Sequence, residues 1–335
     1  MTIKDLAALT GYSVGTISRV LNNQPNVSEK ARKVIQEAAN ESGFQLNANA
    51  QQLKQQHGTS ILVVVKGISN DLFAALLESI QTRINQTNYP LVIDHIDENE
   101  NEVRRAVRLC REKKPLGILF LGGNRKNFLE DFQQITIPCV LVTSDASDLP
   151  FANLSSVSSD DALAARMAIA HLVSLGHRKI TVIGGDRFVS DTTKLRYQGC
   201  MEAFSSQGIP FDPELDYETA RFSFSDGYRA AKQLLKRGRD FTALFAMSDV
   251  MAIGAIRALR DAGKRVPEDV SVMGLDGLEI GEYTIPKLAT VCQAVEELAQ
   301  RSLNLLLGQI EQKSGACHVT IPVCLEWKES ARRIN

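Results

Sequence analysis

The sequence lacks the features that mark membrane and exported proteins. No apolar run approaches the roughly 18 residues that a membrane-spanning helix needs. The opening MTIKDLAALTG contains an acidic residue and has no apolar signal-peptide core. The six cysteines are scattered, mostly inside apolar runs, with no CxxC pair. We therefore expect a cytoplasmic protein with buried, reduced thiols, no metal site and no membrane partner.

Recognisable catalytic motifs are also missing. None of the five histidines has HExxH spacing, and His177 lies in a GHRKI turn where a structural role is favoured. There is no GxSxG motif, no GxxxxGK[ST] loop and no matched Cys, His and Asp set. We predict no catalytic residues and no cofactor; turnover of a bound metabolite would contradict this.

Charge is balanced over the whole chain but not along it. The formal net charge is -1, yet residues 1–60 hold six basic and four acidic side chains, which is +2. The remaining residues therefore carry -3. Two excess charges are a weak signal, but their location favours phosphate binding near the N-terminus.

Residues 1–45 have the pattern of three short helices. Thr2, Ser13 and Ser28 can each cap a helix start, and apolar residues recur at helical spacing after each of them. Only a few residues around Gly11 separate the first two helices. This short turn predicts a small all-α helix-turn-helix domain.

Residues 46–58 are polar and free of aromatics, with a composition that favours helix. So short a helix is marginal in water, so this hinge or linker should order only when something holds it.

Residues 59–335 alternate strand-like and helical stretches in two successive series. The first contains SILVVV, LVIDHI, GILFLGG and PCVLVTS; the second contains ITVIGG, YETARF, FTALFAMSD and DVSVMGLDG. Such strands predict parallel sheets covered by helices on both faces. We expect an α/β core of two doubly wound parallel-sheet lobes, roughly 59–160 plus a late crossover segment, and 161–290 plus part of the C-terminus. The HVTIPVCLEW stretch should return to the first sheet or its edge.

The motifs TIKDLAALTGYSVGTISRVLNN, VSEKARKVIQEAANESGF and NANAQQLK resemble the DNA-binding head and hinge of LacI/GalR-type bacterial repressors. HLVSLGHRKITVIGG, DGYRAA, SDVMAIGAIRALRDAGKRVPEDVSVMGLDG and PKLATV resemble that family's core, in its order, so the resemblance covers essentially the whole chain. It implies a core built like a periplasmic sugar-binding protein. It also implies a homodimeric transcriptional regulator, expected to be a repressor, that binds a palindromic double-stranded DNA operator under allosteric control by a small molecule. No tetramer is expected, because the chain ends soon after the core without a heptad tail.

By this resemblance the second helix would lie in the major groove. Val14, Gly15 and Arg19 would face the bases, and the forked donors of Arg19 suit guanine. The family commonly has a polar or bulky residue where this chain has Gly15, so specificity would shift to Val14, Arg19 and the hinge. Further DNA contacts are expected from Thr2, Ser13, Thr16, Ser18, Asn22, Leu53 and Lys54. Asn22 either ends the helix or reaches the DNA backbone.

In the hinge, Leu53 matches the family's minor-groove wedge and Lys54 its neighbour. Leu46, Asn49 and Gln51 replace a usual proline, a usual apolar residue and a usual arginine. These departures predict lower affinity or a stronger dependence on the dimer. An ordinary flexible linker is the alternative.

Four core residues match the family's effector contacts. Phe73 and Phe222 offer flat faces, Arg196 offers a fork of donors, and Asp276 can accept from adjacent hydroxyls. The alternatives are that Phe222 fills core and that Arg196 pairs with a surface acid. Weaker candidates are Asp191, Thr192, Ser248 and Asp249, the last being favoured as a helix cap. A sugar or sugar phosphate is the first expectation, and a nucleobase or other metabolite stays open.

Two other classes remain as alternatives. One is a cytosolic small-molecule-binding protein without regulatory DNA binding, and the other is a transport-type binding protein. The attached head and the missing signal peptide argue against the second. No motif indicates whether the ligand releases DNA or secures it.

Overall fold

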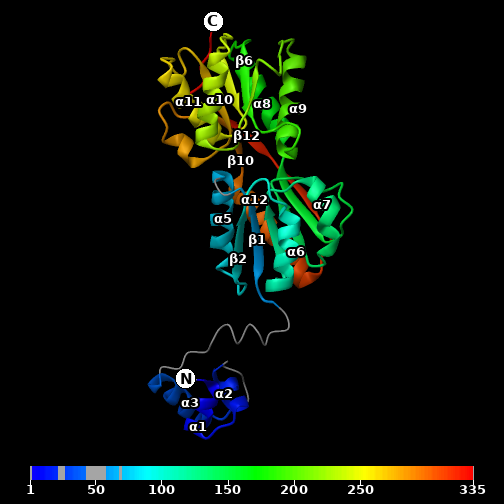
Figure 1. The fold of residues 1–335 in the computed structure, drawn as a ribbon, viewed down its shortest axis with the longest axis vertical. Coiled ribbons are helices and arrows are strands. Elements are labelled where there is room, and N and C mark those ends of the chain that lie inside the picture. Colours follow the sequence, from blue (N-terminus) through cyan, green and yellow to red (C-terminus); the bar gives the residue numbers. More distant parts are fainter. Residues whose placement is uncertain (1, 22–26, 43–57, 68–69, 335) are drawn as a thin grey trace. The chain divides into compact units, whose positions relative to one another are not determined.

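The computed structural model describes residues 2–21, 27–42, 58–67 and 70–334. The chain divides into two compact units, Met1–Gly58 and Thr59–Asn335, which we call the head and the core. Figure 1 shows the elements of each unit.

The described part of the head consists of α1 (Ile3–Thr10), α2 (Val14–Leu21) and α3 (Glu29–Glu41). Thr2 begins α1 with a capping box, in which its hydroxyl accepts from the Asp5 N–H and the Asp5 carboxylate accepts from the Thr2 N–H. Gly11 ends α1 with a φ of 73°. Ser13 accepts from the N–H of Thr16, and Ser28 caps α3. The three predicted helices and their caps are therefore confirmed.

A small apolar core holds these helices together. It is made of side chains that recur at helical spacing on the inner faces: Leu6, Ile17, Val20, Ala31, Ile35 and Ala39. Because each helix contributes only one to three such residues, none would be stable alone.

The first lobe of the core is built on a fully parallel sheet with strand order β11-β5-β4-β3-β1-β2. Its strands are β1 (Ile61–Lys66), β2 (Leu91–Ile96), β3 (Gly117–Leu121), β4 (Cys139–Val142), β5 (Leu154–Ser159) and β11 (His318–Ile321). Its helices are α5 (Asp71–Ile84), α6 (Glu102–Lys113), α7 (Arg125–Asp131), the short η1 (Phe132–Gln134) and α12 (Val295–Gln312).

Alternation along the strands explains why helices cover both faces of this sheet. In β1, Ile61, Val63 and Val65 pack into the cluster formed with α5 and α12. The intervening Leu62 and Val64 pack into the cluster formed with α6 and α7. A strand buried on both sides has no polar face, which is why ILVVV is a continuous apolar run.

The second lobe has a sheet of order β12-β10-β9-β8-β6-β7, parallel except for the antiparallel pair β10 and β12. Its strands are β6 (Ile180–Gly184), β7 (Tyr217–Thr219), β8 (Ala243–Ala246), β9 (Ser271–Asp276), β10 (Ala289–Gln293) and β12 (Val323–Glu326). Its helices are α8 (Asp161–Ser174), α9 (Asp191–Ser206), α10 (Phe224–Lys236), α11 (Asp249–Asp261) and the short η2 (Glu279–Glu282). The pairs α8–α9 and α10–α11 lie on opposite sides of the sheet (Figure 1).

The chain crosses between the lobes three times within the described core. It leaves the first lobe after β5, returns after β10 to form α12 and β11, and leaves again to form β12. The HVTIPVCLEW stretch therefore does not stay with the first sheet. Its first half forms the edge strand β11, as expected, but its second half pairs with β10 in the second sheet, which corrects that prediction.

The cysteines also differ from expectation. Cys139 and Cys200 are buried, but two others are half-buried and two are exposed: Cys110 and Cys292, then Cys317 and Cys324. An apolar run did not guarantee burial here, because β12 is an edge strand with one side open to solvent.

Candidate functional site

The outer face of α2 is open to solvent. Ile17 and Val20 are buried against the other head helices, whereas Val14, Gly15 and Arg19 are exposed. A Cβ added at Gly15 would meet only the Ser13 hydroxyl, at 3.8 Å. Val14 and Gly15 are thus accessible at the start of α2, the part of a recognition helix that reads DNA, and Arg19 is accessible in the last turn of the same helix.

The other predicted DNA contacts divide into two groups. Ser13 and Thr16 lie at the N-terminus of α2, where their hydroxyl oxygens are 2.9 Å apart, and Ser18 is half-buried on the same helix. Thr2 is exposed at the start of α1. Asn22, Leu53 and Lys54 lie outside the described residues.

A cleft of about 890 Å³ opens between the two lobes of the core. Residues that follow the carboxyl ends of strands in both sheets line it, among them Gly67 after β1, Gly122 after β3, Thr143 after β4 and Gly185 after β6. This is where ligands bind in doubly wound sheets.

The second-lobe wall of the cleft is centred on Arg196 in α9. Its guanidinium is 4% exposed and donates from Nε to Asp161 at 2.7 Å and from Nη1 to the Met247 carbonyl. The Asp276 carboxylate lies 3.6 Å from its Nη2 and also accepts from Gln293 at 2.9 Å. Arg196 therefore joins α8, α9 and the ends of β8 and β9, and the alternative of a surface pair is wrong.

Burial changes the pKa of the two carboxyl groups that surround Arg196. It raises the pKa of Asp276 to about 7, although the Arg196 charge opposes this, and it also raises the pKa of Asp161. Burial thus favours the neutral form of both carboxyl groups, whereas the charge of Arg196 favours their ionised form.

Two cleft residues hold a backbone conformation that normally favours glycine. Thr143 has a φ of 74° in the first lobe, and Asp276 has a φ of 130° in the second. Such a conformation costs about 1–3 kcal/mol and clusters at ligand sites, where the surrounding packing imposes it. Each wall therefore contains one strained residue at the carboxyl end of a strand, Thr143 directly after β4 and Asp276 as the last residue of β9.

Aromatic rings are present on both walls. The Phe73 ring lies against Gly122, where a Cβ would come within 2.8 Å of it. The Phe222 ring is half-buried with its centroid 6.0 Å from the Arg196 guanidinium. Both predicted aromatic faces line the cleft.

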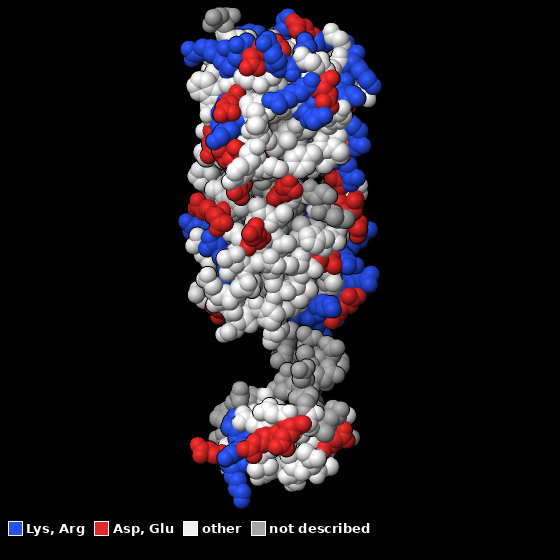
Figure 2. Space-filling model, turned by 90° about the vertical axis from the view of Figure 1, so that its left-hand side faces the viewer, with Lys and Arg blue, Asp and Glu red and all other residues white. Residues whose placement is uncertain are grey.

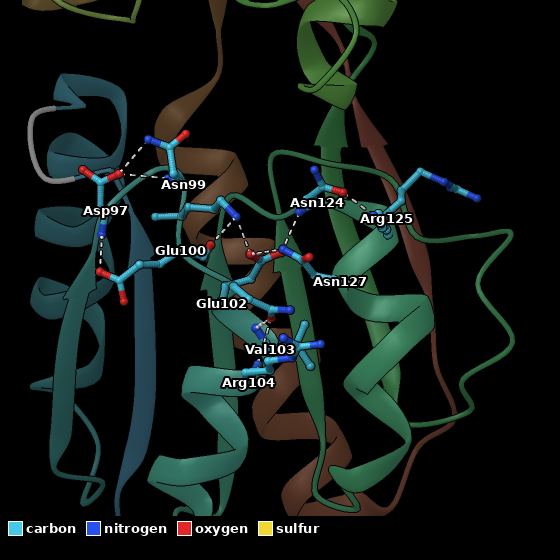
Figure 3. Close-up of polar contacts among 12 residues, drawn as sticks. Asp97, Asn99, Glu100, Glu102, Val103, Arg104, Asn124, Arg125 and Asn127 are labelled. Atoms are coloured by element: carbon cyan, nitrogen blue, oxygen red, sulfur yellow. Dashed lines mark hydrogen bonds and ion pairs between the residues drawn. The ribbon is translucent and has the colours of Figure 1, made fainter.

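The first-lobe wall is organised by Glu102, which is fully buried at the start of α6. Its carboxylate accepts from the Lys66 ammonium, from the Asn124 N–H at 2.6 Å and from the Asn127 amide at 2.9 Å. Figure 3 shows Glu102 of α6 beside Asn127 of α7 and Asn124, the residue that caps the start of α7. The loop that begins α7 is thereby tied to β1.

Contacts across the cleft join the lobes at its rim. The Arg125 N–H donates to Asp191 at 2.9 Å, and the Asn124 amide donates to the Val189 carbonyl at 3.3 Å. Elsewhere on the rim Arg221 pairs with Glu98 and lies 3.5 Å from Asp97. Asp191 is thus a rim residue that holds the lobes together, and Thr192 lies beside it on the lining.

The lining is rich in acids, and its cations are already paired. Among the described lining residues the cations are Lys66, Arg196 and Arg221, and each contacts a carboxylate. Six lining residues are acidic: Asp97, Glu98, Asp186, Asp191, Asp226 and Asp276. Four helices also begin at the cleft, and their first N–H groups already donate to the side chains of their own cap residues Asn70, Asn124, Ser190 and Ser223.

Two predicted effector residues do not line the cleft. Ser248 is 1% exposed and caps α11 by accepting from the Met251 N–H. Asp249 is fully buried and accepts from the Leu278 N–H at 2.7 Å and the Thr290 hydroxyl at 2.6 Å. The cap of α11 is therefore Ser248 and not Asp249. Asp249 instead ties α11 to β10 and to the residues after β9.

Sequence reasoning missed the first-lobe wall apart from Phe73. Lys66 at the end of an apolar strand was a usable signal, because a charge there must face a cleft or a partner. Glu102 lies in the polar stretch ENENEVRR, which is typical of a solvated helix start, so its burial left no mark in the sequence.

Comparison with known proteins agrees with this architecture. Residues 2–47 match the model for bacterial regulatory proteins of the lacI family, and residues 169–331 match that for the periplasmic binding protein-like domain. The HTH-type transcriptional regulator MalR of Clostridium butyricum is 33% identical over 100% of both chains. The regulator DegA of Bacillus subtilis is 33% identical over 100% of this chain and 99% of its own.

Solved structures give the same result for the whole fold. The lac repressor dimer bound to operator and an anti-inducer matches with a TM-score of 0.82 and 26% identity over 99% of each chain. The regulator CelR in complex with cellobiose matches with a TM-score of 0.71 and 26% identity, over 98% of this chain and 99% of that one.

A helix-turn-helix head joined to a two-lobed core with a ligand cleft defines a ligand-controlled, DNA-binding transcriptional regulator. The chain belongs to the LacI family of bacterial regulatory proteins. Among the helices of the described segments, none combines the length and apolarity needed to cross a membrane.

Proposed function

We propose that the protein binds a palindromic DNA operator as a homodimer, with α2 of each protomer in the major groove, and that a neutral, polyhydroxylated ligand in the cleft controls this binding. The exposed trio Val14, Gly15 and Arg19 supports the first part. Arg19 reads guanine, Val14 contacts a thymine methyl, and Gly15 excludes no base. Ser13, Thr16, Ser18 and Thr2 contact the backbone, and Asn22, Leu53 and Lys54 complete the interface.

A weakly charged face of the core supports the dimer. Figure 2 views the core from the side of α5, and the lower lobe in that view has few charged side chains on its middle. The exposed positions of α5 are Ala74, Glu78, Gln81 and Thr82, of which only Glu78 is charged. Depletion of charge is the compositional mark of the centre of a protein interface.

The paired cations of the cleft are the observation that carries the ligand class. An anionic group would have to displace a carboxylate from Lys66, Arg196 or Arg221, whereas hydroxyl groups can donate to the six lining acids. Phe73 and Phe222 offer apolar faces for a sugar ring, and Arg196, Asp276, Asp191 and Thr192 are its polar contacts. A neutral sugar therefore fits better than a sugar phosphate. Closure of the lobes around it would change the spacing of the two heads.

A thermal-shift screen tests the ligand class. Neutral mono- and disaccharides, their phosphates and nucleobases are added to the full-length protein, because a ligand of the native state raises its melting temperature. We expect a neutral sugar to give the largest shift and Asp276→Asn to reduce it. Asp269→Asn is the control, since Asp269 pairs with Arg265 outside the cleft lining. A phosphorylated sugar that outcompetes its neutral parent would contradict the proposal.

Selection of bound sequences from a random duplex pool tests the DNA part. We expect a palindromic consensus, and we expect Arg19→Ala to relax preference at one symmetric pair of positions, a loss of about 1–3 kcal/mol in discrimination. Lys33→Ala on α3 is the control, because loss of a surface charge should weaken binding uniformly across sequences. An unchanged consensus for Arg19→Ala would refute the role of Arg19.

We further propose that the protein carries out no catalytic step, needs no cofactor and acts in the cytoplasm, where the DNA is. Chemical conversion of a bound metabolite during prolonged incubation with the protein would contradict the absence of catalysis.

A further inference from the structure

Two cysteines face each other across the antiparallel strands β10 and β12. Cys292 pairs with Cys324 in register, and Glu326 is two residues further along β12. The two Sγ atoms and a carboxylate oxygen of Glu326 all lie within 4.8 Å of one another. Cys292 is half-buried, while the other two are exposed, so ions can reach the cluster from solvent.

We infer that Cys292, Cys324 and Glu326 form a binding site for a thiophilic divalent cation of the zinc class. Two thiolates and one carboxylate are ligands of Zn²⁺, whereas Mg²⁺ and Ca²⁺ require oxygen alone. Zinc–sulfur bonds of about 2.3 Å place tetrahedral ligand atoms roughly 3.8 Å apart, so only small side-chain shifts are needed. Three protein ligands leave the fourth position to water.

The charged groups around the cluster are compatible with a bound divalent cation. With two thiolates and a carboxylate, the divalent ion leaves one net negative charge. The Lys328 ammonium lies 2.5 Å from the Glu326 carboxylate and balances that charge. The same lysine also pairs with Glu282.

The cluster lies next to the segments that connect the two lobes, where a movement of one lobe relative to the other would change the chain's position. The chain leaves the second lobe after β10 and re-enters it at β12, so two of the three crossings adjoin these strands. Cys292 also pairs in register with Asp276 of the cleft, and a Cβ on Gly277 would lie 2.7 Å from the Cys292 Sγ. A bound cation would therefore fix the two crossing strands to each other directly behind the cleft.

Cobalt binding to the reduced full-length protein tests this site. We expect one Co²⁺ per chain, with thiolate-to-metal charge-transfer absorption and the visible bands of tetrahedral Co²⁺, displaced by Zn²⁺. Trp327, the only tryptophan in the sequence, follows Glu326 directly, so its fluorescence should be quenched by Co²⁺ at the same stoichiometry.

Variants locate the ion. Cys324→Ser should weaken Co²⁺ binding about tenfold or more and lower the charge-transfer band at saturation by about half, because only the Cys292 thiolate remains, while Cys317→Ser, at an exposed cysteine outside the cluster, should leave both unchanged. Glu326→Gln should weaken binding but keep the thiolate band. Because Cys324 is exposed on an edge strand, its serine variant should fold, which circular dichroism checks.

Several results would overturn the inference. One is the absence of thiolate bands at micromolar Co²⁺, and another is equal binding by Cys324→Ser and Cys317→Ser. A third is a chain that binds no cation but forms a Cys292–Cys324 disulfide when treated with hydrogen peroxide, the two thiols giving up two electrons and the peroxide becoming water; the pair would then be a redox dithiol. None of these tests involves DNA or the cleft ligand, so they are independent of the proposed function.

Discussion

Each of the two walls of the cleft contains one buried charge with several hydrogen-bond partners, but the two charges have opposite signs. In the first lobe one buried acid, Glu102, is surrounded by donors from β1 and α7. In the second lobe one buried cation, Arg196, is surrounded by acceptors from α8, from Met247 directly after β8 and from β9. Each arrangement pairs a buried charge and fixes the loops that meet the ligand.

The two walls differ in whether the partners of the buried charge can reach solvent when that charge is removed. Lys66 is 15% exposed and lies on the cleft lining, so it can turn into solvent if its partner is removed. Asp161 and Asp276 are 5% and 6% exposed and cannot turn out in this way. The second wall should therefore be less tolerant of substitution than the first.

Replacement of Arg196 by methionine should have the largest effect. It leaves two buried carboxylates and the Met247 carbonyl without their shared donor, so we expect a loss of about 3–5 kcal/mol in the free energy of unfolding of the core, measured by urea denaturation. Arg166→Met is the control, because Arg166 also joins α8 to α9, but at the surface through Glu202. Equal losses would show that burial does not matter here.

Glu102→Ala should cost less, about 2 kcal/mol, because the freed Lys66 and Asn127 can turn toward water and only the Asn124 N–H stays unpaired. Glu112→Ala on the same helix, which breaks only an exposed pair with Arg108, should change the urea midpoint little. If Glu102→Ala were as costly as Arg196→Met, the contrast between the walls would be wrong.

Arg221→Gln removes an ion pair that spans the two walls at the rim. Its partners are exposed, so we expect the free energy of unfolding, measured by urea denaturation, to fall by less than about 1 kcal/mol. This loss should disappear at high salt. Arg257→Gln, in an exposed pair within α11, provides the matched control. A loss that persists in 1 M salt, where the Debye length is about 3 Å, would indicate a role beyond charge.

A buried histidine should make the second lobe sensitive to acid. Burial, with the nearby Arg332 charge, holds the pKa of His177 below its usual value, although its bond to the Arg332 carbonyl opposes this. The unfolded chain then takes the proton first, so the stability from His177 is present above about pH 6.5 and is lost as the pH falls. We expect His177→Gln to flatten the decline of the melting temperature between about pH 7 and 5. His95→Gln, at an exposed histidine of the first lobe, should leave the slope unchanged.

Sequence reasoning predicted the elements that have strong local signals. The head helices follow from their capping residues, and β1, β3 and β6 follow from continuous apolar runs. The strand β5 was missed because LSSVSS has no such run; its serines are buried through side-chain bonds, for example Ser155 to the Cys317 N–H and Ser156 to His318. The split of HVTIPVCLEW between sheets was also missed, because strand partners are set by tertiary contacts.

The candidate site was predictable only in part, for a similar reason. Phe73, Arg196, Phe222 and Asp276 matched a known pattern and do line the cleft. The Glu102 group and the Cys292–Cys324 pair bring together residues far apart in the chain, so spacing does not reveal them. Ser248 and Asp249 border the right strand but serve the helix start and the packing behind it.

The three crossings have a consequence for how the protein is made. The first lobe is begun early in synthesis, yet α12 and β11, which cover one face of its sheet and complete its edge, come from residues 295–321. A nascent chain stopped just before them would expose the apolar surface that α12 covers, including Leu119 and Val140. The lobe whose strands emerge first from the ribosome is thus completed only at residue 321, shortly before β12 completes the sheet of the second lobe, and a truncation that removed residues 295–321 would leave its sheet uncovered.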